Sequence, residues 1–134
     1  MSQHAIAPPD PVAAERILQR VPYGSRFRIG CLVPPVGLLQ SSVRSLGELE
    51  LAMRPEDRSL VGVNLERLAE WIENAIGDSA CASAVRDAAG AAGSYADACE
   101  AVQRVISDRV AGARQVLASP GHGQVGEPTP RQEA

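Results

Sequence analysis

Lysine is missing from this 134-residue chain, and all thirteen of its cationic side chains are arginine. Chemistry that needs a lysine amine, such as Schiff-base formation, is therefore excluded. The same absence excludes the Gly-x-x-x-x-Gly-Lys phosphate loop. Each cationic side chain instead ends in a planar, permanently charged guanidinium group, whose donors match the oxygens of a carboxylate or a phosphate.

Histidine and cysteine are also scarce. The only histidines are His4 and His122, and the cysteines Cys31, Cys81 and Cys99 show no CxxC spacing. Such a set contains no pair of metal ligands at a usual spacing and offers Cys31 no histidine outside the two ends of the chain. We therefore expect no metal, no cofactor and no catalytic residue, and reduced thiols of a cytoplasmic protein. A cysteine-dependent enzyme is the least favoured alternative.

Aromatic residues and long apolar runs are also scarce. Aromatic residues make up 3% of the chain, so the core must be built from Leu, Val, Ile and Ala. Uninterrupted apolar runs last only a few residues, too short to span a membrane. Residues 1–9 carry Pro8 and Pro9 with no hydrophobic period, and residues 119–134 are rich in proline and glycine. This pattern predicts a disordered tail over 1–9, a single small domain over 10–118 and a disordered Pro/Gly-rich tail over 119–134.

The net charge of −3 is unevenly distributed. Residues 1–47 carry five Arg against two acids, and residues 48–100 carry four Arg against eleven acids. The basic N-terminal segment and the acidic central segment can attract each other within one fold or between two copies. A nucleic-acid partner is less favoured, because a net basic domain with interleaved aromatics is absent.

The N-terminal half alternates turn signals with short periodic segments. Asp10 and Pro11 predict a helix start, and the Arg/Phe/Arg/Ile alternation over 26–29 predicts a strand. Ser45 and Glu48 form a capping box. In chain order we expect a helix over 11–20, a strand over 26–33, a weaker return strand over 36–43, a helix over 46–53 and a brief edge strand over 58–63.

The C-terminal half is dominated by amphipathic helix. Asn64 can cap a helix that ends at Gly77, Asp78 restarts one that runs to about residue 89, and Ser94 opens the last helix after a break over 90–93. The last helix is expected to bury Cys99, Val102, Ile106, Val110, Ala113 and Leu117. The predicted fold is α+β and mainly α: a short N-terminal helix, one small strand or hairpin, then three to four helices ending in a long amphipathic one.

Four short motifs follow one another between residues 26 and 90: Phe27-Arg-Ile-Gly30, Ser45-Leu-Gly-Glu48-Leu49, Trp71-Ile72 and Ile76-Gly77-Asp78. In this order they resemble the pattern of a functionally uncharacterised family of small prokaryotic domains. Two polar features usual in the family, a His before the Trp-bearing helix and an Asn-Asp within it, are replaced by Val63-Asn64 and Glu66-Arg67. The resemblance implies a compact α+β module and no known reaction.

The candidate interface residues are of two kinds. The acidic face of one helix, Glu66, Glu70 and Glu73, is predicted to be solvated and to dock arginines. The N-terminal arginines that can meet this face are Arg16, Arg20, Arg26 and Arg28. The apolar candidates are Trp71, which is more often core than interface, and Val105 and Val116, which lie beside the stripe of the last helix.

We therefore expect a non-enzymatic protein-interaction or assembly/adaptor module of a bacterial cytoplasmic complex. Its partner is expected to be another protein or a second copy, bound through the C-terminal helix. The alternative is an Arg-dependent binder of nucleic acid or a phosphorylated ligand through the N-terminal basic segment.

Overall fold

The computed structural model describes residues 8–33, 35, 37–54 and 60–118. The elements in chain order are α1 (Pro11–Leu18), η1 (Tyr23–Ser25), β1 (Phe27–Val33), β2 (Gly37–Val43), α2 (Leu46–Ala52), β3 (Leu60–Gly62), α3 (Leu65–Trp71), η2 (Ile72–Ile76), α4 (Ser79–Ala91) and α5 (Tyr95–Ala118). The fold is α+β and mainly helical, which confirms the predicted class. The predicted tails, 1–9 and 119–134, fall almost wholly outside the described residues.

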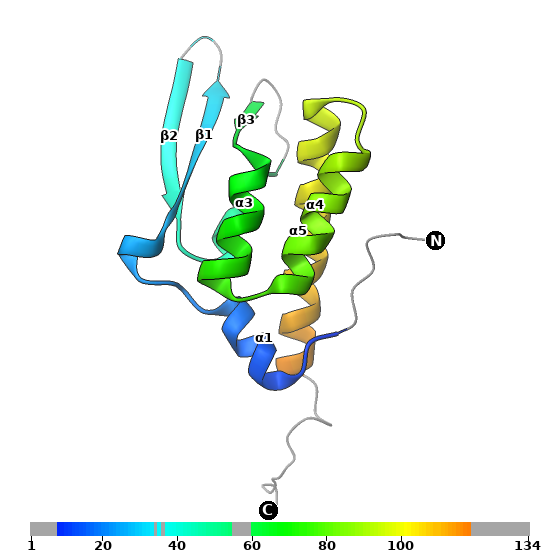
Figure 1. Cartoon of the computed structure of the whole chain (residues 1–134). Coiled ribbons are helices and arrows are strands. Elements are labelled where there is room, and N and C mark those ends of the chain that lie inside the picture. The colour runs from blue at the N-terminus through cyan, green and yellow to red at the C-terminus, as the bar shows by residue number, and fades with distance from the viewer. Residues whose placement is uncertain (1–7, 34, 36, 55–59, 119–134) are drawn as a thin grey trace, which may run out of the picture.

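A small antiparallel sheet with the order β2-β1-β3 forms one side of the molecule. The register of β1 and β2 runs without a break from Phe27 opposite Val43 to Val33 opposite Gly37. The weaker predicted return strand is therefore present. In Figure 1 the hairpin lies at one side, α3 stands beside it, and α4 and α5 lie beyond α3. Ile29 and Val43 are buried against the helices, as the period of two requires.

Side chains cap every predicted helix start. The acceptors are Asp10, Ser45, Asn64, Asp78 and Ser94, and each receives a backbone N–H from three residues further on at 2.8 to 3.2 Å. Each cap satisfies one amide that the first turn of a helix leaves without a partner. Local sequence alone therefore fixes where these helices begin.

The capping box at α2 differs from the prediction in one partner. The Glu48 carboxylate accepts the backbone N–H of Arg44 at 2.7 Å, one residue before the Ser45 cap. Its other oxygen lies 3.1 Å from Nε of Arg20. Glu48 thus ties the end of β2 to the region that follows α1.

A widened turn separates α3 from α4. Gly77 and Asp78 both donate backbone N–H groups to the carbonyl of Ile72, at 2.9 and 3.1 Å, which closes the π-helical turn η2. Gly77 has φ 84°, where a side chain is strained. A Cβ there would also meet Cδ of Arg16 at 3.2 Å. The backbone conformation is what requires glycine, because the exposed Arg16 side chain can move by the few tenths of an ångström that a Cβ would need.

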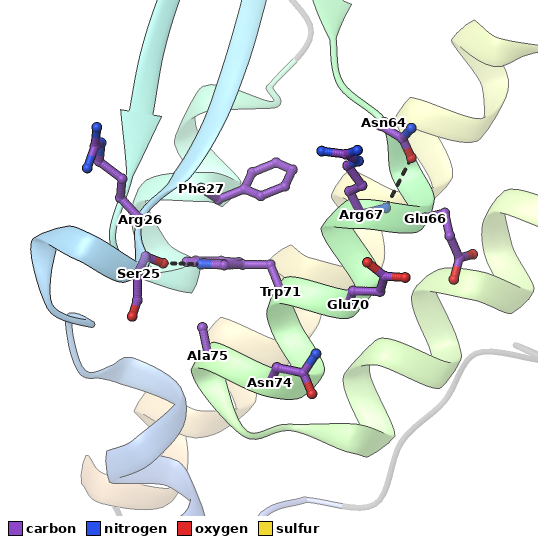
Figure 2. Close-up of a pocket in the computed structure, with 10 residues that line it drawn as sticks. All are labelled: Ser25, Arg26, Phe27, Asn64, Glu66, Arg67, Glu70, Trp71, Asn74 and Ala75. Carbon is purple, nitrogen blue, oxygen red and sulfur yellow. Dashed lines mark hydrogen bonds between the residues drawn. The ribbon is translucent and has the colours of Figure 1, made fainter.

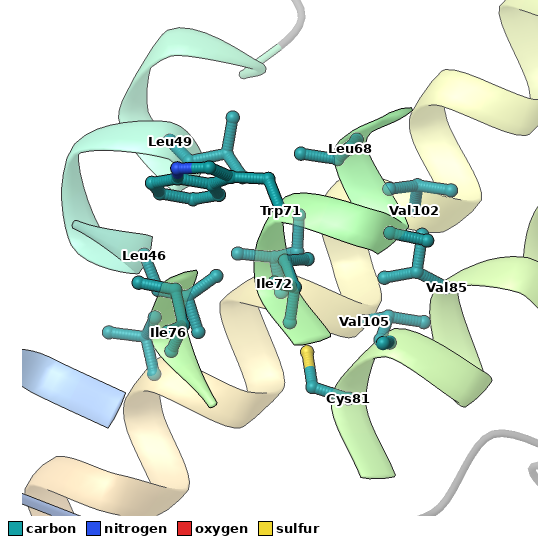
Figure 3. Close-up of a cluster of buried hydrophobic side chains, with 14 of the residues drawn as sticks. Leu46, Leu49, Leu68, Trp71, Ile72, Ile76, Cys81, Val85, Val102 and Val105 are labelled. Carbon is teal, nitrogen blue, oxygen red and sulfur yellow. The ribbon is translucent and has the colours of Figure 1, made fainter. Parts of the chain in front are cut away.

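Helix α5 is the central support of the core and contacts α1, α2 and α4. Figure 3 shows side chains of α2, α3, η2, α4 and α5 meeting in one cluster. Most buried residues of α4 are small, with Cys81, Ala82, Ala84 and Ala88 beside one Val, so α4 lies close against α5.

Two expectations for the C-terminal half are corrected by this arrangement. The break over 90–93 is shorter than predicted, because α4 continues to Ala91. Val105 does not lie on an exposed apolar strip. It is buried, with 6% of its surface exposed, because helices pack around several sides of α5 rather than along one stripe. Val116 and Leu117 are both half-buried.

A buried ion pair joins the start of α4 to the middle of α5. Nε of Arg109 lies 2.7 Å from one carboxylate oxygen of Asp78, and Nη2 lies 3.0 Å from the other. The two side chains are 8% and 5% exposed. Asp78 also caps α4 by accepting the N–H of Cys81 at 3.2 Å. One carboxylate therefore serves both a helix start and a tertiary contact.

We predict that Asp78→Asn destabilises the protein by about 3–5 kcal/mol, because it removes the negative charge from the buried Asp78–Arg109 pair. Asparagine is itself a good N-cap, so the loss reports the ion pair rather than the cap. Urea denaturation followed by circular dichroism measures it. Glu66→Gln, which removes one exposed ion pair, should cost less than about 1 kcal/mol. Equal effects of the two variants would contradict this account.

Burial raises the pKa of the Cys81 thiol to about 12, and the nearby Asp78 carboxylate acts in the same direction. Above roughly pH 9 the unfolded chain releases this proton while the folded chain retains it, so stability is full below that pH and falls toward pH 12. Cys81→Ala removes this titration. The free energy of unfolding of the variant should fall less steeply with pH, by up to about 1.4 kcal/mol per unit. Parallel curves for the two proteins would contradict the raised pKa.

Candidate functional site

An open groove of about 810 Å³ lies between the segment that enters β1 and the face of α3 and η2. Its lining residues are Ser25, Arg26, Phe27, Asn64, Glu66, Arg67, Glu70, Trp71, Asn74 and Ala75. Figure 2 shows these side chains arranged around the space, with Phe27 and Arg26 on one side and the helical residues on the other. Two segments about 40 residues apart in the sequence therefore build one surface.

Trp71 forms the base of the groove and fixes its two sides together. Its indole Nε1 donates a hydrogen bond of 2.6 Å to the carbonyl oxygen of Ser25. Its ring lies 5.6 Å from that of Phe27, at an interplanar angle of 38°. Only 9% of Trp71 is exposed, whereas Phe27 is half-buried. The groove thus has a rigid aromatic floor with one partly accessible ring.

Two acids of α3 and η2 are held by an arginine of α4. Nε of Arg86 lies 3.3 Å from Glu66, and Nη1 lies 3.1 Å from Glu73. The hydrogen bond that Arg86 donates to Glu73, and to a smaller extent the one that it donates to Glu66, raises the pKa of Arg86. The acidic face therefore carries its own counter-charge within the fold.

Two opposite charges remain on the groove side of α3. Arg67 and Glu70 are exposed, and neither forms an ion pair with any side chain in the part of the chain that the structure describes. In Figure 2 the guanidinium of Arg67 extends toward Phe27, and Glu70 lies one turn below it. Arg26 differs, because it covers the Tyr23 ring at 3.9 Å and donates to the Tyr23 carbonyl at 3.0 Å.

Four of the ten predicted interface residues line the groove: Trp71, Glu66, Glu70 and Arg26. The remaining predicted arginines lie elsewhere. Arg16 packs beside Gly77, Arg20 pairs with Glu48, and Arg28 is exposed on β1.

Within one chain, Glu66 and Glu73 do not meet the N-terminal arginines, and a meeting between two copies stays a prediction. Arg86 binds both glutamates instead, because α4 packs against α3 and brings this side chain within reach. Sequence alone could not choose between Arg86 and the N-terminal arginines, since all of them had suitable charge.

The sequence did not identify Arg67, Asn74 and Phe27 as residues of the groove. Arg67, Trp71 and Asn74 stand at i, i+4 and i+7 and therefore share one face of the helical segment. This polar helix face beside a tryptophan could have indicated the groove from the sequence. The contribution of Phe27 could not be predicted from the sequence, because it depends on how the strand packs against the helix.

The structure brings no group of three His, Cys, Asp or Glu close enough to hold a metal ion within residues 8–33, 37–54 and 60–118. Cys31 is half-buried, and Cys81 and Cys99 are buried free thiols. Both histidines fall outside the described residues. No helix in the described ranges combines the length and apolar character needed to cross a bilayer.

Comparison with known proteins finds no matching family model, curated protein or solved structure. The resemblance over residues 26–90 therefore stays a prediction.

Replacing Trp71 with Phe should lower stability by roughly 2 kcal/mol, because it removes the indole hydrogen bond and part of the buried ring. Circular dichroism in urea measures the change, since the only tryptophan is lost as a fluorescent probe. Tyr23→Phe alters an exposed ring and should change stability by less than about 0.5 kcal/mol. If the two variants melt alike, Trp71 does not fix the floor of the groove.

Proposed function

We propose that this chain is a non-enzymatic protein-interaction module, an adaptor of a bacterial cytoplasmic complex, and that the groove binds a short peptide segment of its partner. The observation that carries this proposal is the aromatic floor of Trp71 and Phe27 beside two opposite charges, Arg67 and Glu70, that lack ion partners among the described residues.

The chemistry of the groove suits a peptide that carries both an acidic and a basic side chain. The guanidinium of Arg67 can hold a carboxylate through two parallel hydrogen bonds. Glu70, which lies one helical turn from Arg67, can accept hydrogen bonds from a lysine or an arginine of the peptide. The amide of Asn74 offers a donor and an acceptor, which matches a peptide backbone. An apolar residue between the two charges would rest on the Phe27 ring.

The alternative, an Arg-dependent binder of nucleic acid or a phosphorylated ligand, has less support. Glu66 and Glu70 line the same groove as Arg26 and Arg67, so a polyphosphate would meet carboxylates as well as cations. The other N-terminal arginines are spread over separate parts of the surface. A groove of mixed charge therefore favours a peptide.

We predict that peptides selected from a displayed random library against the full chain carry an acidic residue beside an apolar one, with a basic residue following. Arg67→Glu should reverse the first preference, so that basic residues replace acidic ones at that position. Glu70→Arg should reverse the second. Sequencing of the enriched pools measures both preferences.

Arg104→Glu provides the matched control, because Arg104 is an exposed arginine of α5 outside the groove lining. It changes the net charge by the same amount and should leave the selected sequences unchanged. Identical pools from Arg67→Glu and Arg104→Glu would contradict peptide binding in the groove. Tighter binding of a synthetic phosphorylated peptide than of a selected carboxylate peptide would favour the alternative.

A further inference from the structure

The outer edge of β2 is a second feature of the surface, distinct from the groove. β2 ends the strand order, so no described strand pairs with its outer side. Figure 1 shows it on the far side of β1 from the helices. Leu39 is 50% exposed, and Gln40, Ser41 and Ser42 are exposed. Every second residue of this strand directs its backbone N–H and C=O away from β1.

This edge lacks the features that keep most edge strands from pairing. Natural edges are usually short, kinked by a bulge, or interrupted by charge or proline. β2 runs for seven residues in unbroken register with β1, and its sequence, Gly-Leu-Leu-Gln-Ser-Ser-Val, contains no charge and no proline. The opposite edge, β3, has only three residues. The long uncharged edge is therefore open to strand addition.

We propose that a second copy of this chain occupies the edge, with the two β2 strands antiparallel about a two-fold axis at Gln40. Antiparallel self-pairing always places one residue opposite its own symmetry mate. Placing Gln40, the middle residue of β2, on the axis pairs all seven positions. Gly37 then lies opposite Val43, and Leu39 lies opposite Ser41.

Charge selects a second copy over another strand of the chain as the occupant. β2 offers no counter-charge to a charged partner strand, so an uncharged strand of the same length suits this edge best. β1 carries Arg28, and β3 is too short. Among the described strands only β2 meets the requirement.

Apolar surface supports the same pairing. Leu39 pairs with Cys31 and lies on the face of the sheet that also carries Ile29 and Val43. In the proposed dimer the Leu39 of each copy faces the Ser41 of the other, and both lie on this face of a continuous six-stranded sheet. The half-exposed Leu39 side chain is thereby partly covered.

The dimer is expected to be weak, because seven residues a side are fewer than the roughly 20–30 of a standard interface. A covalent trap is therefore the sharpest test. Gln40→Cys, in a Cys31→Ser background that removes the half-buried native thiol, places two thiols on the axis at disulfide distance. Ser42→Cys is the matched control, since its two copies would lie roughly 13 Å apart along the strands.

We predict that mild oxidation converts Gln40→Cys to a disulfide dimer at least tenfold faster than Ser42→Cys. Non-reducing gel electrophoresis of the full chain measures both rates. Both positions are exposed on the same strand, so random collision would cross-link them equally. Equal rates, or faster dimerisation of Ser42→Cys, would overturn the proposal.

Charge exchange gives an independent readout without a disulfide. Gln40→Lys and Gln40→Glu each place like charges opposite one another at the axis, so each variant alone should sediment as a monomer. An equimolar mixture should dimerise, because Lys then lies opposite Glu. A mixture that stays monomeric at concentrations where the native chain dimerises would overturn pairing at Gln40. A native chain that is monomeric at all concentrations would overturn self-pairing altogether.

Discussion

The buried Asp78–Arg109 ion pair is the interaction on which the helical half of this protein depends. Charges that are 5% and 8% exposed are tolerated only where other groups compensate them, and the two hydrogen bonds between Asp78 and Arg109 supply part of that compensation. Because Asp78 is also the cap of α4, this pairing fixes where α4 begins and which turn of α5 lies beside it. A hydrophobic contact alone would permit sliding along α5, whereas a bidentate pair specifies one register.

The Asp78–Arg109 ion pair also helps to fix the shape of the groove. Asp78 directly follows Gly77, whose positive φ ends the π-helical turn that carries Asn74 and Ala75. Widening a helix by one residue rotates the following side chains relative to an α-helix, and such turns are frequent at functional sites. The Trp71 hydrogen bond then fixes the incoming strand segment against the same helix. The floor and one wall are thus positioned by contacts that lie outside the open space.

The sequence correctly predicted those features of the fold that depend on residues close together in the chain. The five caps, the Gly77 stop and the period of β1 depend on interactions within a few residues, and they were recognised correctly. The burial of Val105, the choice of Arg86 as the partner of Glu66, and the approach of Phe27 to Trp71 depend on which helix lies against which. A single amphipathic stripe gave no indication that α5 is surrounded on several sides. The groove was missed in part for the same reason.

The two proposed surfaces are compatible within one assembly. The groove lies where β1 begins, on the side of Phe27 that faces α3, whereas pairing at β2 uses the opposite side of the hairpin. A dimer joined through β2 would therefore leave both grooves open and hold them at a fixed separation. A partner with two suitable segments would then bind both, and the second contact would form at the high effective concentration that tethering supplies. Two individually weak contacts, a short strand pair and a shallow groove, would in this way produce a stable complex only when all components are present, which is the behaviour an assembly module requires.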